Sequence, residues 1–106
     1  MKVYIVRERS GVNAKGEFDP TTRSLTVLKG SVLSSTIAYT EKFRGAKSIE
    51  KSREGVLKGN VLQTDVAFKS ASTAANFVTG TSTNGLTAWK DKDGKTIKEI
   101  ITEAEG

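Results

Sequence analysis

The stretch from residue 68 to residue 96, FKSASTAANFVTGTSTNGLTAWKDKDGKT, decides the fold expected of this chain. Ser70 is a good helix N-cap, and small and apolar residues follow it up to Gly80, a residue type that commonly ends helices. We therefore expect a short helix between these two residues, with small side chains that allow close packing. Asn84-Gly85 then predicts a tight turn.

The only tryptophan, Trp89, follows this turn and precedes Lys90. A single tryptophan in a small domain is commonly a core or edge residue, because its large ring buries much apolar area. Alternatively, an exposed indole beside a cation would stack on a nucleobase while Lys90 contacts a phosphate. The first turn of the helix after Ser70 would add backbone N–H groups that attract anions. The sequence leaves both roles of the indole open.

Three segments before residue 30 are expected to form a sheet. Residues 1–6 contain consecutive β-branched and aromatic residues, which predicts a strand with both faces covered. Residues 12–18 alternate between apolar and polar side chains, as a half-buried strand does. After a turn signalled by Pro20, residues 25–29 are expected to pair antiparallel with this second strand.

The middle of the chain is less regular. Residues 32–45 show no clear period, so we expect an irregular connection or a short extra strand there. Residues 46–57 have helical spacing of apolar residues, although a glycine weakens the pattern. Residues 61–68 resemble a strand.

The C-terminal segment begins with a turn predicted at residues 91–94. Residues 95–101 form either a strand or a helix, and the spacing of Thr96 and Glu99 favours a helix because it fits a capping box. Together the segments predict a single α+β domain over residues 1–102, with a mixed, largely antiparallel sheet and two or three short helices. Residues 103–106 are expected to form a loose tail.

The 106 residues include neither cysteine nor histidine. These absences exclude disulfides and thiolate nucleophiles, and they disfavour catalytic triads and zinc sites, so we expect no enzyme activity and no cofactor. The apolar run near the N-terminus is too short for a signal peptide or a membrane span, so we expect a cytoplasmic protein without membrane contact.

Three short motifs suggest chemistry but do not fit it. Gly94-Lys95-Thr96 lacks the glycine that a phosphate-binding P-loop requires five residues earlier, where Trp89 stands. The same tryptophan occupies the first ligand position of the calcium loop that residues 91–94 suggest. Ser70, beside Lys69, is better explained as a helix cap than as a nucleophile.

The net charge of +5 is unevenly distributed. Residues 42–69 contain seven cations and three acids, whereas the segment from Lys90 onward is nearly balanced. An electrostatic surface for a polyanion is therefore expected on the middle of the chain. The expected phosphate contacts are Arg44, Lys47, Lys51, Arg53 and Lys58.

Several motifs in a fixed order resemble a known bacterial family. They are LKGS at residues 28–31, FKSASTAA at 68–75, Gly80, Asn84-Gly85, Trp89-Lys90 and Gly94-Lys95-Thr96. Over residues 12–101 the chain resembles a bacterial domain of unknown function that is often attached to the C-terminal side of GIY-YIG-type nucleases and restriction-modification subunits. It is also similar to restriction enzyme and adenine methylase associated domains, which are proposed to read modified DNA. The chain departs from the family at Ala71, where proline is common, and at Leu86, where an aromatic is common.

The resemblance and the charge together predict a non-catalytic, DNA-associated module of a restriction, defence or mobile-element system, with duplex DNA as its partner. The more specific contacts would come from Lys29, Gly30, Ser31, Ser70, Asn84, Trp89 and Lys90. The alternative is a scaffold domain that docks a nuclease or methylase subunit through its sheet face, with the positive charge serving solubility only. The sequence predicts no oligomeric state.

Overall fold

The computed structural model describes residues 1–38 and 45–105. They form an α+β domain, as expected, with a four-stranded antiparallel sheet, a two-stranded ribbon and four helices. The elements are β1 (Lys2–Arg7), β2 (Val12–Phe18), β3 (Leu25–Val27), α1 (Ala46–Arg53), β4 (Leu57–Lys58), β5 (Val61–Leu62), β6 (Val66–Phe68), α2 (Ala71–Thr79), α3 (Gly85–Ala88) and α4 (Ile97–Glu105), with a 3-10 turn at Glu8–Ser10. In the described ranges, no helix is long and apolar enough to cross a membrane.

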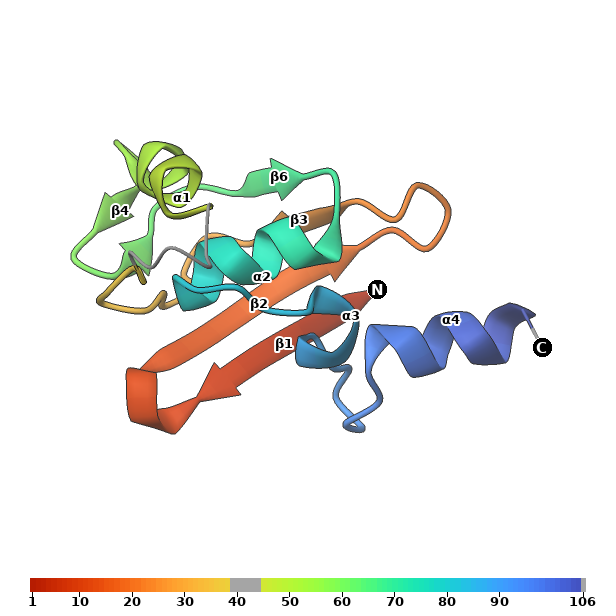
Figure 1. Cartoon of the computed structure of the whole chain (residues 1–106). Helices are drawn as coiled ribbons and strands as arrows, with labels where there is room; N and C mark the ends of the chain where they lie inside the picture. Colours follow the sequence, from red (N-terminus) through yellow and green to blue (C-terminus); the bar gives the residue numbers. More distant parts are fainter. Residues whose placement is uncertain (39–44, 106) are drawn as a thin grey trace.

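The strands of the main sheet follow the order β1-β2-β3-β6, and every pairing among them is antiparallel. The predicted pairing of β3 with β2 is confirmed, with Phe18 opposite Leu25. Figure 1 shows α2 and α3 over one face of this sheet, α1 and the β4–β5 ribbon at one end, and α4 at the other.

Only one face of the sheet is covered. Alternate residues of β2 are buried from Val12 to Phe18, as predicted. The prediction that both faces of the first strand are covered is wrong, because Val3 and Ile5 are buried while Val6 is 61% exposed. The helices that bury β1 all pack on the side of Val3 and Ile5, which leaves the opposite face open to solvent.

Helix α2 forms as its sequence predicts. The Ser70 hydroxyl accepts a hydrogen bond from the backbone N–H of Thr73 at 3.1 Å, which caps the N-terminus. Gly80 ends the helix in the left-handed region with φ +75°. Ala74 and Ala75 are fully buried, so the small side chains let α2 lie directly on the sheet.

Helix α1 belongs to a second, smaller apolar cluster. Its Ala46 and Ile49 are buried against Ile37 and Ala38, apart from the main core. The helix ends at Arg53, earlier than the predicted boundary at residue 57.

Two predictions for the second half of the chain need correction. Residues 61–68 form two short strands, β5 and β6, because they pair with different partners, β4 and β3. Asn84-Gly85 does not make a tight turn but starts α3, because the Asn84 side-chain oxygen caps the N–H of Leu86 at 3.0 Å.

The last segment bears out the helical prediction. Thr96 and Glu99 form the expected capping box, in which the Thr96 hydroxyl accepts from the Glu99 N–H and the Glu99 carboxylate accepts from the Thr96 N–H. The helix then continues to Glu105, so residues 103–105 are helical and not a loose tail. Of the segment predicted to be irregular, residues 32–38 contain only two isolated bridges, both at Val32, and residues 39–44 lie outside the described ranges.

Candidate functional site

The residues predicted to contact nucleic acid lie in separate parts of the fold. Four have intramolecular roles: Ser31, Arg53, Ser70 and Trp89. Five are exposed around α1, β4 and the loop after β3: Lys29, Gly30, Lys47, Lys51 and Lys58. Asn84 and Lys90 line a groove beside β1. Arg44 lies outside the described residues.

Trp89 is a core residue, so the prediction that its ring stacks on a nucleobase is wrong. The side chain is 0% exposed, and its indole N–H donates to the Ala71 carbonyl at 3.0 Å. Room for the indole comes from Gly16 of β2, where an added Cβ would approach the ring at 3.3 Å. A buried tryptophan with a satisfied N–H stabilises the fold and offers no surface to a ligand.

Arg53 also points inward. Its guanidinium donates to the carbonyls of Ser34 and Phe77, with distances of 2.9 Å from Nη1 to Ser34 O and 2.7 Å from Nη2 to Phe77 O. The group lies 5.9 Å from the centre of the Phe77 ring. Because the Phe77 carbonyl lies in the last turn of α2, Arg53 joins α1 to α2 and to the segment at Ser34, and its charge is not directed toward a phosphate.

Two predicted hydroxyl contacts are likewise part of the fold. Ser31 is 3% exposed, and its hydroxyl accepts from the Lys15 N–H at 2.9 Å while donating to the Lys15 carbonyl at 3.2 Å. Ser70 is the N-cap of α2. Both oxygens are therefore engaged in backbone hydrogen bonds, which their replacement would break.

The surface of α1 carries less net charge than the sequence suggests. We call the shallow depression on it the α1 surface, lined by Lys47, Glu50, Lys51 and Glu54. Two lysines and two glutamates balance each other there. The excess of cations counted along residues 42–69 is thus not gathered on the α1 surface.

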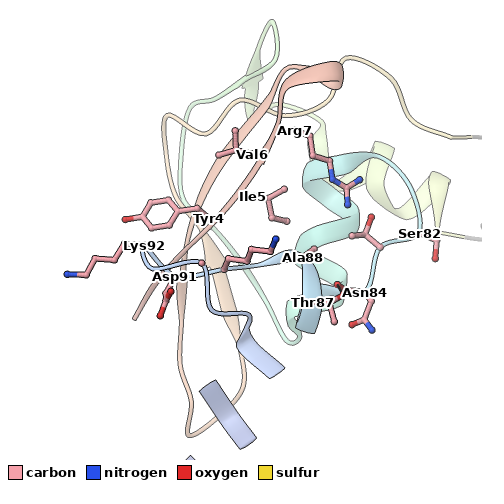
Figure 2. A pocket seen from close by; sticks show the side chains of 13 residues that line it. Tyr4, Ile5, Val6, Arg7, Ser82, Asn84, Thr87, Ala88, Asp91 and Lys92 are labelled. Carbon is pink, nitrogen blue, oxygen red and sulfur yellow. Dashed lines mark hydrogen bonds between the residues drawn. The ribbon is translucent and has the colours of Figure 1, made fainter. Parts of the chain in front are cut away.

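A larger groove lies along the edge of β1 that faces away from β2. It has a volume of about 630 Å³, and we call it the β1 groove; residues 4–7 form one side and residues of the segment 82–94 form the other (Figure 2). Its charged lining residues are Arg7, Lys90, Asp91 and Lys92. The lining thus contains three cations and one acid, so its net charge is positive.

Backbone pairing brings these distant residues together. The N–H of Tyr4 donates to the Lys90 carbonyl at 2.7 Å, and the N–H of Lys90 donates to the Tyr4 carbonyl at 3.0 Å. After this bridge the chain turns, and Asp91 Oδ1 accepts from the N–H groups of Asp93 and Lys95, each at 2.9 Å. One carboxylate oxygen of the acid in the groove is therefore engaged by the backbone of its own turn.

The opposite side of the groove offers polar groups. Figure 2 shows Asn84 and Ser82 across from Arg7. Asn84 uses its oxygen to cap α3, but among the described residues its amide nitrogen has no partner, and neither has the Ser82 hydroxyl. These donors, together with the cations, suit an anionic ligand rich in hydrogen-bond acceptors.

Among the groove residues that could contact a ligand, sequence reasoning missed Tyr4, Arg7, Ser82 and Lys92. No local pattern links the first strand to a segment more than 80 residues later. The one signal in the sequence was that successive side chains of a strand point to opposite faces. Tyr4 therefore lies on the face opposite to the buried Val3 and Ile5.

The comparison with protein families identifies a domain of unknown function and shows nothing about an association with nucleases or restriction-modification subunits. The model of a family described as a domain of unknown function (DUF4357) matches residues 4–101. The chain belongs to this family. No curated protein and no solved structure matches it. In the parts of the chain that the structure describes, no group of three or more His, Cys, Asp or Glu side chains is placed to hold a metal ion.

Proposed function

We propose that this DUF4357 domain is a non-catalytic, DNA-associated module of a restriction, defence or mobile-element system, and that it contacts DNA through the β1 groove. The observation that carries the proposal is the excess of cations in this groove, whose lining includes Arg7, Lys90 and Lys92 but only one acid, Asp91. Nearby, the Glu17 carboxylate is already paired with Lys2 at 3.1 Å and with the Met1 amino group at 2.9 Å.

The expected mechanism is phosphate neutralisation. Lysine and arginine side chains that contact phosphates release condensed counterions, so affinity falls linearly with the logarithm of salt concentration. Such contacts position the protein on DNA without reading its sequence. The free amide nitrogen of Asn84 and the Ser82 hydroxyl would add hydrogen bonds to phosphate or base acceptors, including those of a modified base.

A salt titration of binding to duplex, modified duplex and single-stranded DNA tests the proposal. Replacing Lys90 and Lys92 together by Ala should weaken the salt dependence of binding. The slope of log K against log salt should become less negative by about two units, one for each lost phosphate contact. The matched control replaces Lys47 and Lys51 by Ala, which removes the same charge from the α1 surface. We expect this control to change the slope little, because the lining of the α1 surface contains as many glutamates as lysines.

The two double variants give a clear contrast. Unchanged slopes in both would contradict phosphate binding through either surface. A larger change in the α1 variant would place the DNA contacts on the middle of the chain, as the charge count along the sequence suggests, and would remove the β1 groove from the proposal.

The second function, a scaffold that docks a nuclease or methylase subunit, is favoured by the uncovered sheet face and by Val6, which is 61% exposed on the edge strand. Exposed apolar residues on a free strand edge support pairing with another chain. Under this proposal, Val6→Lys should abolish capture of the purified subunit, while the Lys90 and Lys92 variant should leave it intact.

A further inference from the structure

The ring of Tyr4 lies on the uncovered face of the sheet. Figure 2 shows it projecting from β1 toward the side of Lys92 and Asp91, away from Arg7 and Asn84. Tyr4 is half-buried, and among the described residues its hydroxyl makes no hydrogen bond. The core of the domain therefore does not account for this aromatic ring.

Cations flank Tyr4 along the ladder. Lys15 of β2 is its direct partner on one side, and Lys90 is its partner on the other. Directly opposed residues of an antiparallel pair share a face of the sheet, so the exposed Lys15 side chain stands beside the ring. The acid nearest in this row, Glu17, is paired with Lys2.

Backbone pairing fixes the position in the sheet from which the Tyr4 side chain projects. Tyr4 is paired on both sides, through the β1–β2 ladder and through its two hydrogen bonds to Lys90. A tyrosine side chain has only two χ angles, so it loses little conformational freedom when it binds a flat ligand. Aromatic rings on sheets between cations are a common platform for unpaired bases, because every base has a π-face and each nucleotide a phosphate.

We infer that Tyr4 stacks on an unpaired nucleobase while Lys15, Lys90 and Lys92 contact the adjoining phosphates. This inference rests on the proposed function and narrows its ligand, because the faces of bases inside a duplex are already covered. The ligand class is therefore single-stranded DNA or the single-stranded part of a junction. Tyr4 takes the stacking role that the sequence suggested for Trp89.

The experiment compares the full chain with Tyr4→Leu and Tyr4→Phe, using a single-stranded oligonucleotide of about 12 nucleotides and a duplex of the same length. Tyr4→Leu should weaken single-strand binding roughly 5- to 150-fold, the range expected for one lost stacking contact. It should leave the salt slope and the duplex affinity unchanged, because no charge is removed. Tyr4→Phe should bind like the wild type, since the ring is retained.

Each result decides the inference. Single-strand binding by Tyr4→Leu at wild-type affinity would overturn it, and so would an equal loss on both probes, which would indicate general damage to the groove. Tyr4→Trp supplies a second measurement that does not remove packing: it should bind the single strand at least as tightly as the wild type, and weaker binding would count against stacking. If the wild type binds no nucleic acid at any salt concentration, the proposed function itself fails.

Discussion

The α1 surface and the β1 groove differ in how their charge arises. The α1 surface lies in the segment with the largest excess of cations along the chain, yet its described lysines alternate with Glu50 and Glu54. The β1 groove draws Arg7 from the start of the chain and Lys90 and Lys92 from a nearly balanced segment. The net charge of a sequence segment therefore does not predict the net charge of a surface, because the fold determines which cations and acids lie on the same surface.

The largest effect on the difference between the two surfaces is expected from Gly85→Ala, which should displace α3 and with it one side of the β1 groove. A Cβ at position 85 would overlap the backbone of Ala71 and Ser72, which no rotamer change relieves. We expect a loss of unfolding free energy of about 3 kcal/mol or more, measured by urea denaturation. The control Gly94→Ala has φ +84° but open space around it, so it should cost about 1 kcal/mol. Equal losses would show that α3 does not rest on α2 at this point.

Arg53→Met tests whether the cations of α1 serve different purposes. The variant keeps the apolar stem but leaves the carbonyls of Ser34 and Phe77 without their guanidinium donor. We expect a loss of about 3 kcal/mol in unfolding free energy. Lys51→Met on the same helix should change stability by no more than about 0.5 kcal/mol, because this side chain is exposed. A comparable loss in the two variants would contradict the internal role of Arg53.

Ser70→Ala separates capping from ligand contact. Loss of the hydroxyl that accepts from the Thr73 N–H should lower stability by about 1 kcal/mol, as measured by thermal unfolding. Ser70→Asn should restore most of it, since asparagine is an equally good cap. DNA affinity of the folded alanine variant should equal that of the wild type, and a selective loss of affinity would return Ser70 to the binding surface.

The smallest effect concerns Glu17, next to the row of Tyr4 and Lys15. A hydrogen bond from the Met1 amino group, followed by one from Lys2, holds the pKa of Glu17 below its usual value of 4.5. The ionised carboxylate therefore stabilises the fold above about pH 4.5, and this contribution is lost as the pH falls through the folded-state pKa. Glu17→Gln should be slightly less stable than the wild type at about pH 6, and the difference should shrink as the pH is lowered below about 4.5, as denaturation over this pH range would show. A difference that grows on acidification would have the wrong sign.

Local patterns predicted much of the fold. The alternation in residues 12–18, the Ser70 cap with Gly80, and the capping box of Thr96 and Glu99 all depend on neighbours within a few residues, and all are confirmed. The two-strand split of residues 61–68 was missed because it depends on which strands lie beside each half.

The candidate site was harder to predict, since it depends on contacts between distant segments. Nothing near Trp89 in sequence indicates that Gly16 leaves a space for its ring. Likewise, the exposure of Tyr4 beside Lys90 follows from a backbone bridge that joins the first strand to the turn after α3. In the sequence, Arg53 cannot be distinguished from an exposed cation on a helix. Its internal role follows only from its contacts with the carbonyls of Ser34 and Phe77, which are distant in sequence.

The link that Arg53 makes between α1 and α2 has a consequence for motion. Because α1 buries its apolar residues in a separate small cluster with residues 37 and 38, its amides should exchange with deuterium by local opening, without unfolding of the main sheet. The guanidinium bonds to the Ser34 and Phe77 carbonyls would have to break in that opening. Arg53 should thus control how often α1 opens locally while the amides of β1 and β2 remain protected from exchange.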